Sequence, residues 1–261
     1  MLFIGDSHSN SISFQAQSAL KEVGISSYAY AHSGCIAFRG LTFTDPRRNS
    51  DCDGYIREML AHAKAEGITT LVITSRFTLY VEGTGFDNGE GAPDHGEGSG
   101  VDRIELIRER APDPAAAPAY GETRRERVLA TFASELEDLT REFNVVLVYP
   151  IPEAGWDVPL FVAQNGRHLD APREFGTLHS RFLDRNRAVE ELFDGLDLQR
   201  LFRVRPADLF CNTILPDRCA FTRDGVPLYY DDNHLANGTG AKMLAPLIVE
   251  QVEKALSAPA L

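Results

Sequence analysis

Blocks of apolar and polar residues follow one another along the chain in a way that predicts strands alternating with helices. A short apolar run occupies residues 2–4, and apolar residues then recur at helical spacing from Ile12 to Val23, where Gly24 supplies a C-terminal cap. The apolar stretch at 25–31 predicts a second strand. A strand, helix, strand order of this kind favours a parallel sheet.

The alternation continues towards the C-terminus. Helical spacing at 56–63 is stopped by Gly67, and the compact apolar run at 68–74 predicts the third strand. The remaining predicted elements are a helix over 128–143, strands over 144–150 and 201–204, and a helix from about 239 to 256. The pattern therefore predicts one domain over residues 1–261, a three-layer α/β/α fold whose central parallel five-stranded sheet has the flavodoxin-like order 2-1-3-4-5.

Between about residues 82 and 121 the pattern breaks down. Seven glycines lie between positions 83 and 100, and the segment "APDPAAAPAYG" follows. This composition indicates an insertion in the domain. Two interpretations remain open. The insertion is either a mobile lid or binding loop beside a site, or a solvated surface loop without a functional role.

Composition and charge narrow the classes of function. The chain has 261 residues, of which 43% are hydrophobic, enough to bury a full core in one domain. Its formal net charge of -12 argues against nucleic acid or an anionic lipid surface as a partner. The sequence has neither a long apolar span nor a signal-peptide pattern at its start. Because the first strand is short for a central one, we expect the chain to be a domain excised from a longer protein.

Four cysteines, Cys35, Cys52, Cys211 and Cys219, lie in loop-like contexts. They allow three pairings, or they could remain free thiols. Pairing Cys35 with Cys52 and Cys211 with Cys219 needs short loops, and closing a loop of about fifteen residues stabilises a fold by about 3 kcal/mol. Such disulfides would place the domain in an oxidising compartment. We expect no metal, because the sequence lacks a C-x-x-C motif and its histidines show no metal-ligand spacing.

Candidate chemistry lies at the two ends of the chain. The stretch "LFIGDSHSN" places Ser7 where the first strand ends and a helix begins, so unpaired helix N–H groups could stabilise an oxyanion beside it. A turn with a capping serine would explain this stretch on its own. However, "YYDDNHLANGTGA" at the far end supplies His234 as a base for Ser7 and Asp231 to orient the imidazole.

Two neighbouring residues are weaker candidates for that site. Asp232 is a less favourable orienting group than Asp231 on spacing alone. We expect the side chain of His8 to point away from the nucleophile and to form a hydrogen bond within the fold.

The residues "GDSH" at 5–8 and "DDNH" at 231–234 resemble the first and last blocks of the SGNH/GDSL superfamily of serine esterases and acyltransferases. Further segments, among them "SGC", "ITSRFTLY" and "VYPIPEAGWDVP", are similar to the SGNH domains fused behind the membrane-embedded acyltransferase-3 domain of bacterial glycan O-acetyltransferases. GDSH alone is a weak signal, but GDSH followed by D-x-x-H in this order is strong.

The resemblance implies a catalytic triad of Ser7, Asp231 and His234, with the N–H of Gly34 as an oxyanion donor. The superfamily's third block, G-x-N-D, is missing, and Arg76 stands roughly at its place. Three roles are open for Arg76: donating to the oxyanion, binding a sugar, or forming a structural salt bridge.

Trp156, the single tryptophan, could stack on a sugar ring, but a lone tryptophan is more often a core or rim residue.

The resemblance also implies an activity and a location. We expect an extracytoplasmic O-acetyltransferase domain that moves an acetyl group onto a hydroxyl of a cell-surface polysaccharide through a serine acyl-enzyme. An upstream acyltransferase-3 domain in the same polypeptide would tether it to the inner membrane and deliver the acetyl group from acetyl-CoA, without a cofactor in this domain. Two alternatives are a carbohydrate O-acetyl esterase that uses the same triad and a non-catalytic glycan-binding module with a vestigial triad.

Overall fold

A five-stranded parallel sheet forms the centre of the structure, a computed structural model that describes residues 1–43, 51–91, 107–109, 124–166 and 173–258. Its strands are β1 (Leu2–Gly5), β2 (Tyr28–Ala31), β4 (Thr70–Thr74), β6 (Asn144–Val148) and β8 (Leu201–Val204). They lie in the order β2-β1-β4-β6-β8, which is the order 2-1-3-4-5 among the five. The predicted fold class and strand order are confirmed.

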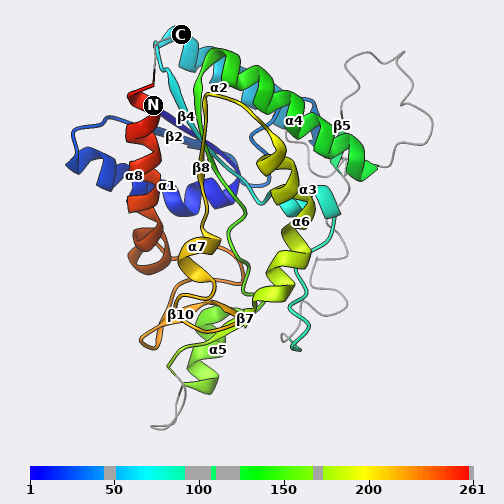
Figure 1. Cartoon of the computed structure of the whole chain (residues 1–261), viewed down its shortest axis with the longest axis vertical. Helices are drawn as coiled ribbons and strands as arrows, with labels where there is room; N and C mark the ends of the chain where they lie inside the picture. Colours follow the sequence, from blue (N-terminus) through cyan, green and yellow to red (C-terminus); the bar gives the residue numbers. More distant parts are fainter. Residues whose placement is uncertain (44–50, 92–106, 110–123, 167–172, 259–261) are drawn as a thin grey trace.

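Helices cover both faces of this sheet, with α8 on one side and α4 and α6 on the other (Figure 1). The helices of the first layer are α1 (Ser7–Glu22) and α8 (Lys242–Leu256), and those of the second are α2 (Cys52–Ala65), α4 (Arg124–Glu142) and α6 (His179–Gly195). Successive strand residues alternate between the layers: Phe3 packs with α1 and α8, whereas Leu2 and Ile4 pack with α2, α4 and α6. Two apolar cores therefore hold the sheet from opposite sides.

Shorter elements surround the three layers. The helical ones are α3 (Phe77–Glu82), α5 (Val158–Asn165), α7 (Ala207–Phe210) and a π-helical turn at Asn237–Ala241. Three antiparallel ribbons pair β3 (Leu41–Phe43) with β5 (Ile107–Glu109), β7 (Gly176–Leu178) with β9 (Arg218–Ala220), and β10 (Thr222–Arg223) with β11 (Val226–Pro227). Most of the insertion predicted at 82–121 lies outside the described residues, so its role stays a prediction.

The end of β1 is shaped by a glycine. Gly5 has φ of +152°, and a Cβ atom at this position would lie 1.7 Å from the carbonyl oxygen of Thr74 in β4. A side chain here would separate two central strands, so the nucleophile turn requires glycine. Because the strands are parallel, their carboxyl ends meet at one edge of the sheet, and Ser7 lies at that edge.

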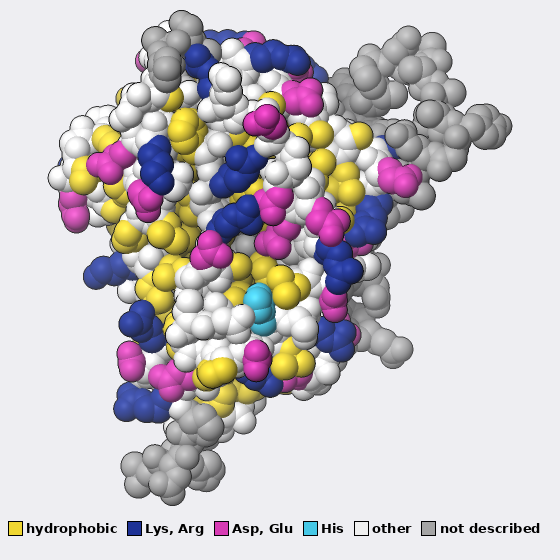
Figure 2. Space-filling model, viewed as in Figure 1, with side chains coloured by type: hydrophobic (Ala, Val, Ile, Leu, Met, Phe, Trp, Pro, Cys, Tyr) yellow, Lys and Arg dark blue, Asp and Glu magenta, His cyan; other side chains and the backbone are white. Residues whose placement is uncertain are grey.

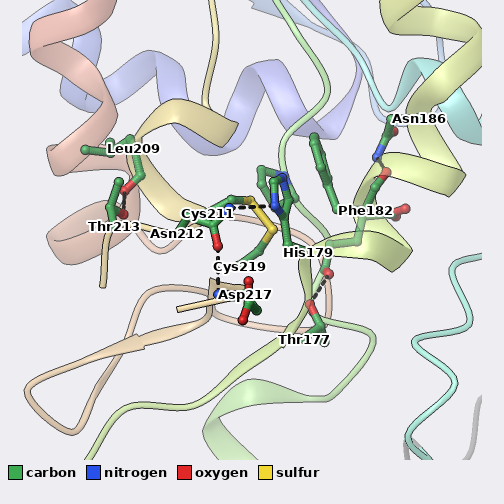
Figure 3. The surroundings of a disulfide bond; sticks show 12 residues. Thr177, His179, Phe182, Asn186, Leu209, Cys211, Asn212, Thr213, Asp217 and Cys219 are labelled. Atoms are coloured by element: carbon green, nitrogen blue, oxygen red, sulfur yellow. Dashed lines mark hydrogen bonds between the residues drawn. A yellow bond between two sulfur atoms is a disulfide. The ribbon is translucent and has the colours of Figure 1, made fainter. Parts of the chain in front are cut away.

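Two disulfides link cysteines that are neighbours in the sequence. Cys35–Cys52 joins the loop after β2 to the first residue of α2, and Cys211–Cys219 joins the end of α7 to β9 (Figure 3). No cysteine is free. Within the described part of the chain, none of the helices has the length and apolarity needed to cross a membrane.

Candidate active site

Ser7, His234 and Asp231 form a continuous chain of hydrogen bonds. Nε2 of His234 lies 2.7 Å from Oγ of Ser7, and Nδ1 of His234 lies 2.7 Å from Oδ2 of Asp231. An ionised carboxylate can only accept, so Nδ1 carries the imidazole proton and Nε2 is left to accept the hydroxyl proton of Ser7. The structure therefore brings together all three residues expected for the triad, in the arrangement that general-base activation of a serine requires.

Backbone hydrogen bonds explain why the aspartate and the histidine of the D-x-x-H motif at 231–234 are three positions apart. Oδ1 of Asp231 accepts the N–H groups of Asn233, at 2.9 Å, and of His234, at 2.7 Å, so one carboxylate holds both the turn and the imidazole. Tyr230 donates its N–H to the carbonyl oxygen of His234 at 3.0 Å, which closes the loop. Burial raises the pKa of Asp231, but the bonds from His234 and the two amides outweigh burial and hold this pKa below its usual range.

Asp6 fixes the turn that presents Ser7. Its buried carboxylate caps α1 and accepts three hydrogen bonds, from the N–H of His8 at 2.8 Å, the N–H of Arg76 at 2.9 Å and the hydroxyl of Tyr80 at 2.8 Å. Burial raises the pKa of Asp6, against the effect of these donors. The carboxylate thus ties the nucleophile turn to the segment after β4. Asp6 belongs to the GDSH motif, but the sequence predicts no role for it beyond that of a turn residue.

Two backbone N–H groups beside the nucleophile are unpaired within the described part of the chain, those of Ser7 and Gly34. Ser7 is the first residue of α1, whose first-turn N–H groups carry partial positive charge. Gly34 has φ of +79° in the loop after β2, and that loop is held against β1 by the N–H of His32, which donates to the carbonyl oxygen of Gly5 at 3.0 Å. Both groups remain candidate donors to an oxyanion.

Arg76 forms the salt bridge that was one of its three expected roles. Its guanidinium pairs through Nε and Nη2 with Glu153, and Nη2 also lies 3.9 Å from Oδ2 of Asp232. The side chain is largely buried, and these two carboxylates raise its pKa although burial lowers it. Arg185, with Nε 3.8 Å from Glu153, adds a second cation to the cluster. Glu153 and Arg185 could not be predicted from the sequence, since neither belongs to a catalytic motif.

His8 is hydrogen-bonded within the fold, next to the last motif. Its Nε2 lies 2.9 Å from Oδ1 of Asn233, whose Nδ2 donates to Oδ1 of Asp232 at 2.6 Å, so the expected hydrogen bond within the fold is present. The ring of His8 also lies 4.9 Å from the ring of His234, so His8 packs beside the imidazole that contacts Ser7. This position follows from the packing of α1 against α8 and the π-helical turn, which brings the first turn of α1 close to the loop at 231–234.

His8 is uncharged and lies next to His234, the candidate base. Burial, and then the charges of His234 and Arg76, lower its pKa to about 3. The carboxylate of Asp232 fixes the amide of Asn233 with its oxygen towards His8, so Nε2 of His8 carries the proton and donates. The ring next to the imidazole of His234 is therefore uncharged at neutral pH.

Tyr230 and Trp156 lie in different settings. The ring of Tyr230 stacks on that of His234, with centroids 5.3 Å apart and planes 9° apart. Trp156 is half-buried, and its ring contacts Phe161 at 4.8 Å in a cluster that includes Phe175 and Phe221. The contacts of Trp156 are those of a rim residue, and its role towards a sugar stays a prediction.

One group of metal-ligand types occurs among the described residues, His179 with Cys211 and Cys219. Both sulfur atoms belong to the disulfide of Figure 3, so they offer no thiolate to a metal ion. His179 is held through Nδ1, 2.7 Å from Nδ2 of Asn212. On the face drawn in Figure 2, basic and acidic side chains are interspersed without a basic patch.

Comparisons with known proteins place this chain in a family. The family model described as "SGNH domain (fused to AT3 domains)" matches residues 1–250. A search of curated proteins finds no significant match. Among solved structures, the chain is similar to the periplasmic domain of a lipopolysaccharide acetyltransferase from Salmonella ser. Paratyphi A, with a TM-score of 0.59 and 11% identity over 97% of this chain and 83% of that chain. At this identity, the likeness to the solved structure is one of fold.

Proposed function

We propose, from the premise that this chain belongs to the family of SGNH domains fused to AT3 domains, that it is an extracytoplasmic O-acetyltransferase domain acting on a cell-surface polysaccharide. The observation that carries the proposal is the chain of hydrogen bonds from Ser7 through His234 to Asp231. The fold is shared with a domain whose name states acetyl transfer to lipopolysaccharide, which supports this choice of chemistry.

In the first half of the reaction, Oγ of Ser7 attacks the carbonyl carbon of the acetyl donor while its proton passes to Nε2 of His234. The carbonyl electron pair moves to oxygen, where the N–H groups of Ser7 and Gly34 are the proposed donors. When the tetrahedral intermediate collapses, the bond to the leaving group breaks and His234 returns the proton to that group. The acetyl group then remains as an ester on Ser7.

In the second half, a sugar hydroxyl replaces the leaving group. His234 removes its proton as the oxygen attacks the acetyl carbon, and the bond to Ser7 breaks with return of the proton to Oγ. The ionised carboxylate of Asp231 stabilises the imidazolium that forms in each half. If water takes the place of the sugar, the same steps give an O-acetyl esterase.

The proposed source of the acetyl group rests on the AT3 domain to which SGNH domains of this family are fused. An AT3 domain preceding this chain would bring the acetyl group from acetyl-CoA to the extracytoplasmic side, so this domain needs no cofactor of its own. Both disulfides suit an oxidising compartment such as the periplasm.

An assay of transfer separates the proposed activity from hydrolysis. The chain is mixed with p-nitrophenyl acetate as donor and with de-O-acetylated surface polysaccharide from the cells that carry the gene. We expect new O-acetyl signals on the polysaccharide by nuclear magnetic resonance, and their loss in Ser7→Ala but not in Ser33→Ala. Release of acetate without labelled polysaccharide would support the esterase, and no turnover would support the glycan-binding module.

A further inference from the structure

The edge strand of the central sheet exposes aromatic side chains. Within the described residues β2 pairs with β1 alone, and three of its four residues are exposed, whereas β1, β4 and β6 are buried throughout. Tyr28 is 59% exposed and Tyr30 is 39% exposed. A strand of a doubly wound sheet is normally covered on both faces, so large exposed rings on β2 indicate a surface with a function.

Helix α2 adds two rings beside this strand. The ring of Tyr30 lies 6.1 Å from that of His62, and the ring of His32 lies 5.1 Å from that of Tyr55. Alternate residues of an extended chain point to one side, so Tyr28, Tyr30 and His32 follow each other along the face next to α2. We call these five residues, Tyr28, Tyr30, His32, Tyr55 and His62, the aromatic strip.

The aromatic strip leads to the candidate active site. Its end at His32 is joined to the nucleophile turn, because the N–H of His32 donates to the carbonyl oxygen of Gly5 at 3.0 Å. Gly34, the candidate oxyanion donor, follows two residues later. The disulfide between Cys35 and Cys52 ties this loop to the start of α2, one turn before Tyr55. A covalent link therefore holds the two sides of the strip in a fixed relation to the site.

We propose that the aromatic strip binds the acceptor polysaccharide, holding sugar residues of the chain beyond the one whose hydroxyl reaches Ser7. This inference rests on the proposed function. From position 28 to position 32 an extended strand covers roughly 13 Å, which is room for a short run of sugar rings. The strip would thus present several residues of one glycan chain to the same surface.

The chemistry of the strip favours a glycan over other occupants. Tyrosine and histidine rings offer flat apolar faces to the C–H faces of sugars, while their O–H and N–H groups can bond to sugar hydroxyls. None of the five residues is an acid, a lysine or an arginine. The chain carries a net charge of -12, which opposes binding of an anionic membrane surface.

Binding is measured by affinity electrophoresis and calorimetry, with de-O-acetylated surface polysaccharide from the cells that carry the gene as the probe. The Ser7→Ala protein serves as background, so that no turnover occurs. We expect Tyr28→Ala/Tyr30→Ala to weaken binding at least tenfold, and Tyr28→Phe/Tyr30→Phe to keep most of it. Phe14→Ala is the matched control, because Phe14 is 64% exposed on α1 at the other face of the sheet.

The outcomes separate this inference from the proposed function. Unchanged affinity in Tyr28→Ala/Tyr30→Ala, or no binding by the Ser7→Ala background, overturns the role of the strip even if acetyl transfer is observed. A change in self-association by light scattering, without a change in glycan affinity, assigns the strip to a protein interface and also overturns it. Loss of binding in the alanine variant, with hydrolysis of p-nitrophenyl acetate unchanged when Ser7 is present, supports it.

Discussion

The ring of Tyr230 lies nearly parallel to the ring of His234, with centroids 5.3 Å apart and planes 9° apart, while 53% of the Tyr230 residue surface remains exposed. One face of Tyr230 therefore covers the imidazole that Asp231 orients. The stack restricts rotation of the ring that must reach Asp231 and Ser7 at the same time. Tyr230 is thus a positioning residue in the proposed mechanism.

Replacing Tyr230 tests this stack. Aromatic pairs contribute about 0.5–1.5 kcal/mol beyond the area that they bury, so Tyr230→Ala should lower kcat for p-nitrophenyl acetate by roughly 2- to 12-fold. Tyr230→Phe keeps the ring and should remain close to wild type. Equal losses in both variants would show that the hydroxyl of Tyr230, rather than its stacked ring, matters.

Asp231 and Asp232 are adjacent carboxylates, but replacing each of them should change kcat to a different extent. Asp231→Asn replaces the acceptor of the imidazole proton and favours the wrong tautomer, so kcat should fall by about 10⁴-fold, as expected for the orienting acid of a serine triad. Asp232→Asn serves as the matched control, since Asp232 bonds to Asn233 rather than to His234. Its loss in kcat should be at least ten times smaller. A larger loss for Asp232→Asn than for Asp231→Asn would reverse the assignment.

Asp6 should matter for stability as well as for geometry. Asp6→Ala leaves two N–H groups and the hydroxyl of Tyr80 without their buried acceptor, and each such group costs about 1–3 kcal/mol. Asp157→Ala is the control, because Asp157 is an exposed cap of α5 and its removal should cost about 1 kcal/mol. Urea unfolding gives both free energies. A loss for Asp6→Ala no greater than that of the control would contradict the anchoring role.

The buried His8 predicts a pH dependence of stability. Its pKa is about 3 in the folded chain against 6.5 when unfolded, so below pH 6.5 the unfolded state binds a proton that the folded state does not. Its contribution to stability is therefore fully present above pH 6.5 and is lost as the pH falls towards 3, at about 1.4 kcal/mol per pH unit.

His8→Gln removes this titration while it keeps a hydrogen-bonding side chain next to Asn233. The free energy of unfolding should fall less steeply between pH 6 and about pH 4 in His8→Gln than in wild type. The comparison between the two proteins cancels contributions that both share, such as that of the buried Asp6. Parallel curves would show that His8 does not stay uncharged in the folded chain.

The sheet could be predicted from sequence because its order follows from local patterns. Strands β1, β4 and β6 are buried on both faces and read as continuous apolar runs, and helices α1, α4 and α8 show apolar spacing on one face. Helix α6 is not predicted by this pattern. One position of its buried stripe is Asn186, which accepts a hydrogen bond from Thr78 at 2.5 Å, so the stripe looks interrupted in the sequence.

Non-local pairing explains most of the remaining differences. β7 and β9 are three residues each, and Thr177 pairs with Cys219 more than forty positions later, which no local pattern encodes. The same holds for the site. Motif spacing identified Ser7, Asp231 and His234, but the ion pair of Arg76 with Glu153 depends on how the ends of β4 and β6 meet.

The identity of the acylated residue tests the central claim most directly. The chain is incubated briefly with p-nitrophenyl acetate, quenched in acid, digested and mapped by mass spectrometry. We predict one acetyl group on Ser7, absent in Ser7→Ala and strongly reduced in His234→Ala. Turnover of the ester by a Ser7→Ala protein at the wild-type rate, or acetylation of another residue alone, would contradict the proposed mechanism.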